Sequence, residues 1–313
     1  MEIYGNVLAE NVKIHTDTAV ALGKFDGLHR GHRALIKMLA DAKSSDKMKA
    51  AVFTFTKSPK EVLNHEVQKY ILTSSEKRLF MEQNGIDILV ECPLEEEILS
   101  MEPEAFISDI LCNSLSAKKI FCGEDCGFGH KRRGNAALLK GLESKYGYET
   151  TVIKKLQHNN RDISSTYIRE EIAKGNIPLV NELLGYPYTV MGVVQKGRQL
   201  GSTIGFPTAN IVPDEDKLLP PNGVYYTNAY VDGQKYSGIT NIGTRPTVNG
   251  DNSITVETNL FDVSMDLYGK TLELQFLRFI RAEKKFSSVE ELKEAVEADI
   301  QRCRKSTGPV WSD

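Results

Sequence analysis

The 313-residue sequence lacks several features that would place it in a specialised class. It has no apolar run near the roughly 20 residues that a membrane helix needs, and residues 1–17 lack the basic segment and apolar core of a signal peptide. Its five cysteines are an odd number without paired spacing, which argues against a disulfide framework. The net charge of −3 gives no global case for binding nucleic acid or membranes. We therefore expect a cytoplasmic protein whose partners are small molecules; the sequence indicates no oligomeric state.

The first half of the sequence alternates short apolar runs with helical patterns. Strands are predicted at 18–23, 50–55, 86–91, 118–123 and 149–154. Helices are predicted at 32–43, 73–85, 100–115 and 135–147, with a capping box at Thr73 and Glu76 and a cap at Ser100. This alternation predicts an α/β domain with a mostly parallel sheet covered by helices.

The second half changes to strand and turn patterns near residue 184. Asp232-Gly233 lies between two β-rich runs and indicates a hairpin. A helical pattern returns only at the end, where Ser288 and Glu291 form a second predicted capping box. We therefore predict two domains, 1–183 and 184–313, the second being a small antiparallel β-barrel with a C-terminal helix.

The stretch "GKFDGLHRGH" (23–32) follows the first strong strand, where open parallel sheets bind their ligands. Gly23, Gly27 and Gly31 allow sharp turns or close approach of a ligand. His29 and His32 lie at the start of a helix, whose free N–H groups and positive dipole end suit an anion. No third metal ligand lies nearby, which weakens a zinc interpretation. A glycine turn with two surface histidines is the structural alternative.

Two further stretches of the first half accompany this one: "CGEDCGFGHKRRGN" (122–135) and "ISSTYIREEI" (163–172). The three together resemble the adenylyltransferase half of bacterial bifunctional riboflavin kinase/FAD synthetases, a nucleotidylyltransferase with a Rossmann-like fold. The resemblance implies His29, His32 and Arg169 as catalytic residues and Asp125 and Phe128 as flavin contacts. It further implies a set of ATP and phosphate contacts: Gly23, Phe25, Asp26, Gly31, Ser164, Ser165 and Thr166. A helix cap at Ser164 or Ser165 is the alternative for the serines.

The barrel half has its own glycine-rich stretch, "GVVQKGRQLGSTIGFPTANI" (192–211). Gly197, Gly201 and Gly205, with Arg198 among them, form a loop whose N–H groups can surround phosphates. Thr208 and Asn210 offer oxygen ligands of the kind that Mg²⁺ prefers. A glycine-rich hairpin loop is the alternative.

"GFPTAN", "NGVYYTNAYVDGQKYSGITNIGTRPTV" and "VETNLFD" resemble the riboflavin kinase module of the same family. The resemblance implies that Glu257 is the catalytic base, which agrees with the need for a carboxylate when an alcohol attacks a γ-phosphate. Arg281 is either a flavin contact or the ion-pair partner of Glu283. The implied activities are phosphorylation of riboflavin to FMN and adenylylation of FMN to FAD, with ATP as co-substrate and Mg²⁺ as cofactor.

The sequence departs from the family pattern at two positions of the first half. Ser58 stands where a histidine is common, and Cys126 stands where an aromatic residue is usual. An aromatic face is a good platform for a flavin, so we expect altered FMN affinity but retained adenylylation. The alternatives are a riboflavin kinase with a weakened first domain and a non-catalytic flavin-sensing regulator.

Overall fold

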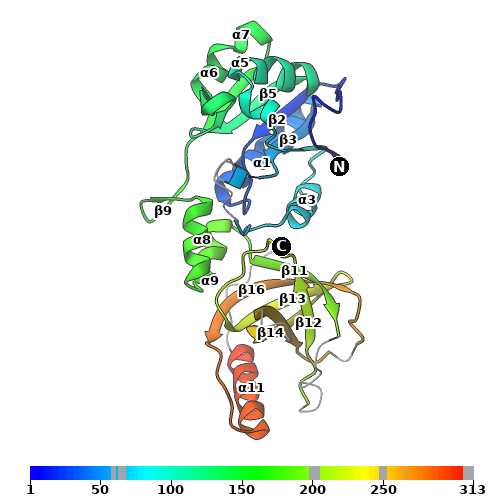
Figure 1. Ribbon diagram of the computed structural model, residues 1–313, viewed down its shortest axis with the longest axis vertical. Helices are drawn as coiled ribbons and strands as arrows, with labels where there is room; N and C mark the ends of the chain where they lie inside the picture. The colour runs from blue at the N-terminus through cyan, green and yellow to red at the C-terminus, as the bar shows by residue number, and fades with distance from the viewer. Residues whose placement is uncertain (58–60, 63–67, 197–204, 247–251, 264, 306–313) are drawn as a thin grey trace. The chain divides into compact units, whose positions relative to one another are not determined.

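The computed structural model describes residues 1–313 except 58–60, 63–67, 197–204, 247–251, 264 and 306–313 (Figure 1). Contacts divide the chain into two compact units, Met1–Ser165 and Thr166–Asp313. Helix α9 (Ile177–Leu184) and all but the first residue of α8 (Ser165–Ala173) belong to the second unit, because α9 packs on strands of the barrel. The domain boundary that the sequence predicts after residue 183 remains a prediction.

The first unit is built on a six-stranded parallel sheet in the order β1-β4-β3-β2-β5-β8. The parallel sheet and all five expected strands are confirmed. The added edge strand β1 is only three residues long, too short to carry a periodic pattern. The strands are β1 (Glu2–Tyr4), β2 (Thr18–Leu22), β3 (Lys49–Phe55), β4 (Ile88–Cys92), β5 (Ala117–Gly123) and β8 (Glu149–Ile153).

Helices cover both faces of this sheet. Helix α1 (Arg30–Asp46) packs on β2, β3 and β5 through its apolar stripe, which includes Leu35 and Leu39. The π-helix η1 (Phe106–Ser114) belongs to the core cluster that contains Val20 and Val90. The other elements are α3 (Ser74–Gln83), α4 (Glu96–Ser100), α5 (Pro103–Ala105), η2 (His130–Arg132), α6 (Ala136–Gly141), α7 (Glu143–Tyr146) and the hairpins β6 (Gly127–Phe128)–β7 (Gly134–Asn135) and β9 (Gln157–His158)–β10 (Arg161–Asp162).

Two helix predictions need correction. Ser100 does not cap a helix over 100–115 but ends α4, because the next residues are extended and Pro103 disfavours a helical conformation before it. The helix expected over 135–147 is divided into α6 and α7 at Leu142. The capping box of α3 is confirmed: the Thr73 side chain accepts from the Glu76 N–H, and Glu76 accepts from the Thr73 N–H.

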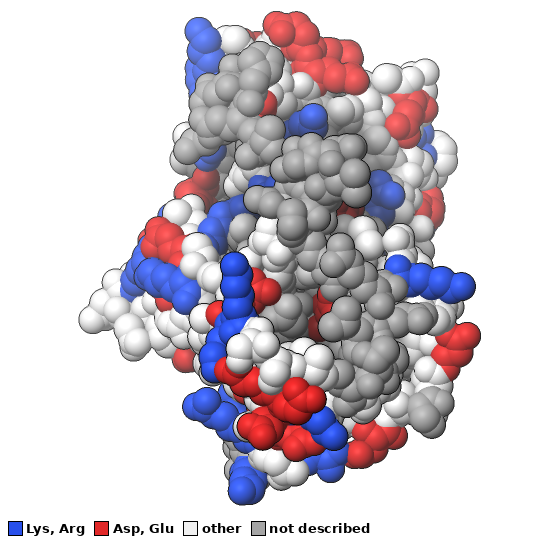
Figure 2. Space-filling model, turned by 60° about the horizontal axis from the view of Figure 1, so that its bottom comes forward, with Lys and Arg blue, Asp and Glu red and all other residues white. Residues whose placement is uncertain are grey.

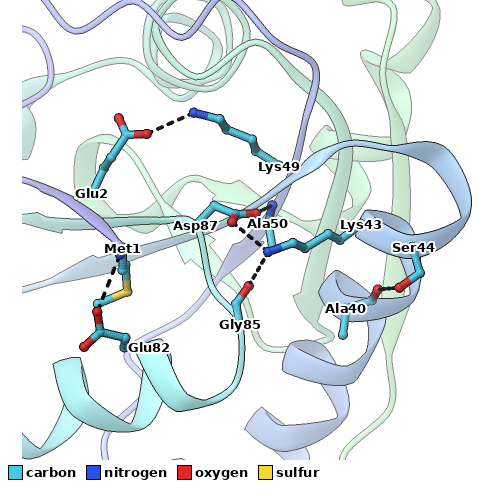
Figure 3. Close-up of polar contacts among 10 residues, drawn as sticks. All are labelled: Met1, Glu2, Ala40, Lys43, Ser44, Lys49, Ala50, Glu82, Gly85 and Asp87. Carbon is cyan, nitrogen blue, oxygen red and sulfur yellow. Dashed lines mark hydrogen bonds and ion pairs between the residues drawn. The ribbon is translucent and has the colours of Figure 1, made fainter.

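Charged side chains connect several elements at the end of the parallel sheet where its strands begin (Figure 3). Asp87 precedes β4; its carboxylate accepts from Lys43 Nζ at 2.7 Å and from the Ala50 N–H of β3 at 2.9 Å. Lys43 Nζ also donates to the Gly85 carbonyl, and Lys49 Nζ lies 2.9 Å from Glu2 on β1. These contacts tie α1, β1, β3 and β4 together at the edge opposite to the loops that carry the histidines.

The second unit contains a closed antiparallel barrel in the order β11-β12-β15-β14-β13-β16, as predicted (Figure 1). Its hairpin turn at Asp232-Gly233 has φ values of 51° and 75°, which suit the right-handed twist of the two strands. The C-terminal helix α11 (Val289–Arg304) begins after Ser288, whose side chain accepts from the Glu291 N–H as expected, and packs Val296 and Ile300 on the barrel. The predicted capping box is not complete, because the Glu291 carboxylate accepts from the N–H of Ser287 rather than from that of Ser288. The strands are β11 (Tyr188–Gln195), β12 (Ala209–Pro213), β13 (Gly223–Val231), β14 (Gln234–Pro246), β15 (Asn252–Leu260) and β16 (Thr271–Arg281).

The barrel interior combines aromatic packing with a chain of buried hydroxyls. The ring of Phe276 packs on Tyr225 at a centroid distance of 5.3 Å. Thr227, Thr240 and Thr258 are each 0% exposed, and their hydroxyls are linked at 2.8 Å and 3.0 Å across three neighbouring strands. Mutual hydrogen bonding removes the cost of burying these polar groups.

Charged side chains of both signs are mixed over the surface in Figure 2. Ion pairs among exposed residues include Arg304 with Asp262 and Lys284 with Glu291. Exposed pairs of this kind contribute little to stability.

Candidate functional sites

The first candidate site lies where the parallel sheet reverses its strand order. Strands β3 and β4 continue the sheet on one side of β2, and β5 and β8 continue it on the other. Leu22 at the end of β2 is in register with Cys122 near the end of β5, so the loops 23–29 and 124–126 leave adjacent strand ends. Such a switch point is where open α/β sheets bind ligands. The structure therefore brings two of the three predicted motifs together.

The loop after β2 is held in an unusual conformation. Phe25, Gly27 and Leu28 all have positive φ, at 50°, 82° and 41°. Glycine is needed at position 27 because an added Cβ would lie 2.9 Å from the Ile71 side chain. Asp26 is buried, and its carboxylate accepts from the Ile71 N–H at 3.1 Å. Two non-glycine residues at positive φ store strain that surrounding contacts must overcome, which is common at functional sites.

The two histidines lie against each other at the start of α1. Their rings stack at a centroid distance of 3.8 Å, and His32 lies 5.0 Å from the fully buried ring of Phe25. Burial lowers the pKa of His29 to about 4 and holds the pKa of His32 well below 6.5. Gly31 leaves room for the first ring, since an added Cβ would lie 3.2 Å from His29 Cε1.

Both imidazoles carry a buried Nδ1 without a hydrogen-bond partner among the described residues. Buried polar atoms are normally satisfied, so two adjacent exceptions call for an explanation. Both rings are neutral near pH 7, and each can donate one N–H to a ligand. No acidic residue lies in the first turn of α1 to compete for an anion. The pair is therefore suited to phosphate oxygens at a helix N-terminus.

The segment after β5 supplies a carboxylate that acts on His29. Asp125 acts to raise the pKa of His29, although burial has the larger effect. Its carboxylate lies 3.2 Å from Lys155 Nζ. Phe128 is buried in the sheet core, and its ring centroid lies 5.2 Å from that of Phe106. The ring therefore packs in the core, and its flavin contact remains a prediction. Cys126 is half-buried against the same core. Ser58, the other departure from the family pattern, lies outside the described residues.

A hydrogen bond joins the serine-rich motif to the histidine loop. Ser165 Oγ donates to the Asp26 carbonyl at 2.8 Å, where α8 begins. Ser164 is half-buried just before the helix. Thr166 and Arg169 lie on α8 within the second unit, so the roles predicted for them remain proposals.

The structure also adds charged residues that the sequence reasoning did not select. Glu91 is 4% exposed on β4, and Lys77 is 8% exposed on α3. Lys77 Nζ lies 3.7 Å from Glu91 Oε1, and Arg78 Nε donates to Glu91 Oε2 at 2.6 Å. A glutamate inside the buried run "ILVEC" is the sequence signal for this cluster, because charged residues are almost never fully buried unless they are paired.

The second candidate site is a polar row on the outside of the barrel. Glu257 of β15 is directly opposite Asn210 on β12 and Asn241 on β14. Their buried neighbours Val256 and Ala209 face the interior, so strand alternation turns the three polar side chains outward. Side chains directly opposite across such strands have Cβ atoms about 4.5–5.5 Å apart. The register therefore brings Glu257 and Asn210 together as predicted.

Thr208 precedes β12 by one residue and is half-buried. The chain is held there by Asn259 Nδ2, which donates to the Pro207 carbonyl at 2.8 Å. Gly205 has a φ of 86° and open space around it. The predicted phosphate contacts Gly197, Arg198 and Gly201 lie outside the described residues.

Arg281 ends β16 and forms an ion pair with Asp299 of α11 at 2.8 Å. Glu283, the partner considered from the sequence, instead accepts from the side-chain amides of Asn222 and Asn241. The Arg281 guanidinium also lies over the Phe286 ring, at 5.6 Å from its centroid. These contacts anchor α11 to the barrel, and a flavin contact for Arg281 remains a prediction.

A loop suited to anions on a parallel sheet and an acid–amide row on a barrel fit one class of protein, a two-domain transferase that acts on phosphates. Comparison with known families agrees with this division. The family model for FAD synthetase matches residues 11–167, and the model for riboflavin kinase matches residues 184–307. The described residues include no helix long and apolar enough to cross a membrane.

Curated relatives match over nearly the whole chain. The bifunctional riboflavin kinase/FMN adenylyltransferase of Bacillus subtilis is 35% identical over 294 residues, covering 91% of each chain. The Escherichia coli enzyme of the same description is 35% identical, covering 92% of each chain. A crystal structure described as a macrolide-efflux protein from Streptococcus pneumoniae is 30% identical, with a TM-score of 0.86 over 98% of this chain and 100% of its own. The chain belongs to the family of bifunctional riboflavin kinase/FMN adenylyltransferases.

Proposed function

We propose that this chain carries out both reactions of its family. Residues 184–313 transfer the γ-phosphate of ATP to riboflavin and give FMN. Residues 1–183 transfer AMP from a second ATP to FMN, giving FAD and pyrophosphate. The observation that carries the proposal is that each domain keeps its own set of reactive side chains: the stacked histidines at the switch point and the Glu257 row on the barrel.

In the first domain, the neutral His29 and His32 donate N–H groups to phosphate oxygens of ATP. Negative charge grows around the α-phosphorus and on the departing pyrophosphate as the phosphate of FMN attacks. Donors fixed in advance stabilise that charge without a covalent intermediate. Contact with phosphate also raises the pKa of each imidazole, so the donors strengthen as charge develops. Arg169, Ser164, Ser165 and Thr166 are the further donors we propose, and Asp125 is the proposed flavin contact.

In the second domain, Glu257 accepts the proton of the riboflavin hydroxyl as its oxygen attacks the γ-phosphate. The strand register turns this carboxylate outward, to the face of the barrel that also presents Asn210. Thr208 and Asn210 offer a hydroxyl and an amide oxygen on the same side, a donor set that fits Mg²⁺. When bound, Mg²⁺ neutralises charge on the β- and γ-phosphates.

We propose a cytoplasmic location, since all five cysteines are free thiols and both reactions consume ATP. Small molecules are the partners that this activity requires.

The test is to incubate the purified chain with riboflavin, ATP and Mg²⁺ and to separate the flavins by chromatography. The proposal expects FAD to form by way of FMN. Accumulation of FMN alone would favour a riboflavin kinase with an inactive first domain. Formation of neither product would favour a flavin-sensing regulator.

A further inference from the structure

The first domain buries more charge than its fold requires. Glu91 lies on the second strand from the sheet edge, at 4% exposure, and faces two cations, Lys77 and Arg78, from the first half of α3. Removing charged groups from water is expensive, and even a paired cluster is seldom favourable for stability alone. A cluster of this kind therefore points to a use beyond stability.

The contacts within the cluster are unequal. Arg78 Nε makes a 2.6 Å hydrogen bond to Glu91 Oε2, whereas Lys77 Nζ lies 3.7 Å from Glu91 Oε1. The second separation is an ion pair but exceeds hydrogen-bond length. Glu91 Oε1 has no hydrogen-bond partner among the described residues. Glu91 thus faces Lys77 without using up the hydrogen-bond donors of its ammonium.

This cluster lies beside the histidine loop. Helix α3 starts shortly after Ile71, whose N–H is bound by Asp26 of that loop at 3.1 Å. The ammonium of Lys77 acts to lower the pKa of His32, and the Asp26 carboxylate acts to raise the pKa of Lys77. The charged and titratable groups that face Lys77 are therefore Glu91 on β4, Asp26 in the loop, His32 on α1 and Arg78 on its own helix.

Burial opposes the charge of Lys77 and lowers its pKa, while Glu91 is the strongest influence in the opposite direction. Without Glu91, the ammonium would lose its proton at a lower pH. A neutral amine could not attract a triphosphate, which carries several negative charges.

We propose that Glu91 is a positioning residue for adenylyl transfer, which keeps Lys77 charged and directed at the phosphates of ATP next to His32. This inference rests on the proposed adenylyltransferase function. It assigns Lys77 direct phosphate contact and gives Glu91 an effect on the substrate only through Lys77.

The experiment measures FAD formation from FMN and MgATP between pH 6 and pH 10, with riboflavin kinase activity of the same samples as an internal check of folding. Glu91→Gln keeps the shape of the side chain but removes its charge. We expect its KM for ATP to rise about tenfold or more, and its activity to fall at a lower pH than in wild type. Lys77→Met should show the raised KM without that pH dependence, and Glu91→Asp should restore part of the wild-type profile.

Asp46→Asn is the matched control, because it removes a carboxylate from an ion pair with Lys119 at the opposite edge of the sheet. It should leave KM and the pH profile unchanged. The proposal is overturned if Glu91→Gln keeps the wild-type KM for ATP and pH profile, or if it lowers kcat equally at every pH with KM unchanged. Absence of FAD formation by the wild type would instead refute the adenylyltransferase function itself.

Discussion

The two domains prepare for ATP in different ways. In the parallel-sheet domain, the proposed site residues His29 and Asp125 lie beyond the strand ends, and the loop before His29 has strained backbone at Phe25 and Leu28. In the barrel, Glu257 and Asn210 lie within strands, and the ladder between β12 and β15 sets their distance. A loop site depends on many tertiary contacts around it, whereas a strand site depends on register. We therefore expect substitutions to affect activity and stability differently in the two domains.

The largest effect is expected at Glu257, the catalytic base that we propose for the barrel. Glu257→Gln should lower FMN formation by about 10²–10⁴-fold, the usual contribution of a general base. Conversion of added FMN to FAD should be unchanged, since it belongs to the other domain. Chromatography of the two half-reactions measures both effects. Glu273→Gln on β16, whose carboxylate accepts from Gln275, is the control; normal FMN formation by Glu257→Gln would contradict the base assignment.

A substitution in the histidine loop should have the opposite effect, lowering FAD formation and leaving FMN formation intact. His29→Ala removes one phosphate donor and should lower FAD formation from FMN by about 10²–10³-fold, as for loss of a donor to a developing anion. Riboflavin phosphorylation should remain intact. The exposed His15 provides the matched control as His15→Ala. If His29→Ala lowered both half-reactions equally, the two sites would not be independent.

The pH dependence of stability should differ between the domains. The pKa of His29 is about 4 in the folded chain and 6.5 without the fold, so the unfolded chain takes up a proton first as the pH falls. Stability is then full above about pH 6.5 and declines toward pH 4, by about 3 kcal/mol for this residue. Urea unfolding of the first domain at several pH values measures this decline. His29→Gln should make the decline shallower, with His32 still contributing because its pKa is also lowered by burial. An unaltered slope would show that the His29 imidazole is not buried as described.

The smallest effect is expected at the end of the parallel sheet where its strands begin, opposite to the histidine loop. Asp87→Asn at this end should reduce the free energy of unfolding by about 1 kcal/mol, because its carboxylate accepts both from Lys43 and from the β3 backbone. Both activities should be unchanged, as measured beside thermal denaturation. Asp41→Asn, in an exposed pair with Lys37, should change neither stability nor activity. Loss of FAD synthesis in Asp87→Asn would mean that the two ends of the sheet are coupled.

The alternation of apolar runs was sufficient to predict the parallel sheet and the barrel, because both patterns follow from which faces are buried. Helix ends were predictable where a side chain caps them, as at Thr73, and not where backbone geometry intervenes, as at Met101. The histidine pair was visible as a motif. Its stacking and the neutrality of its rings were not, because they depend on burial by Phe25 and on the Ile71 contact with the loop.

The charged cluster of Glu91 and Lys77 shows the limit of such reasoning most clearly. The two residues are 14 positions apart, on different elements, and neither belongs to a recognisable motif. Only the packing of α3 beside β4 brings them together. A charged residue within a buried strand is the kind of anomaly that can direct attention to such pairs.

The buried hydroxyl chain of Thr227, Thr240 and Thr258 has a consequence for the opposite face of its strands. A slip of one residue between β14 and β15 would turn Thr258 toward solvent and displace Glu257 from Asn210 and Asn241. The threonines penalise that slip by leaving hydroxyls without partners. Thr240, buried on the inner side of its strand, can therefore matter to the chemistry proposed for Glu257 by holding the register.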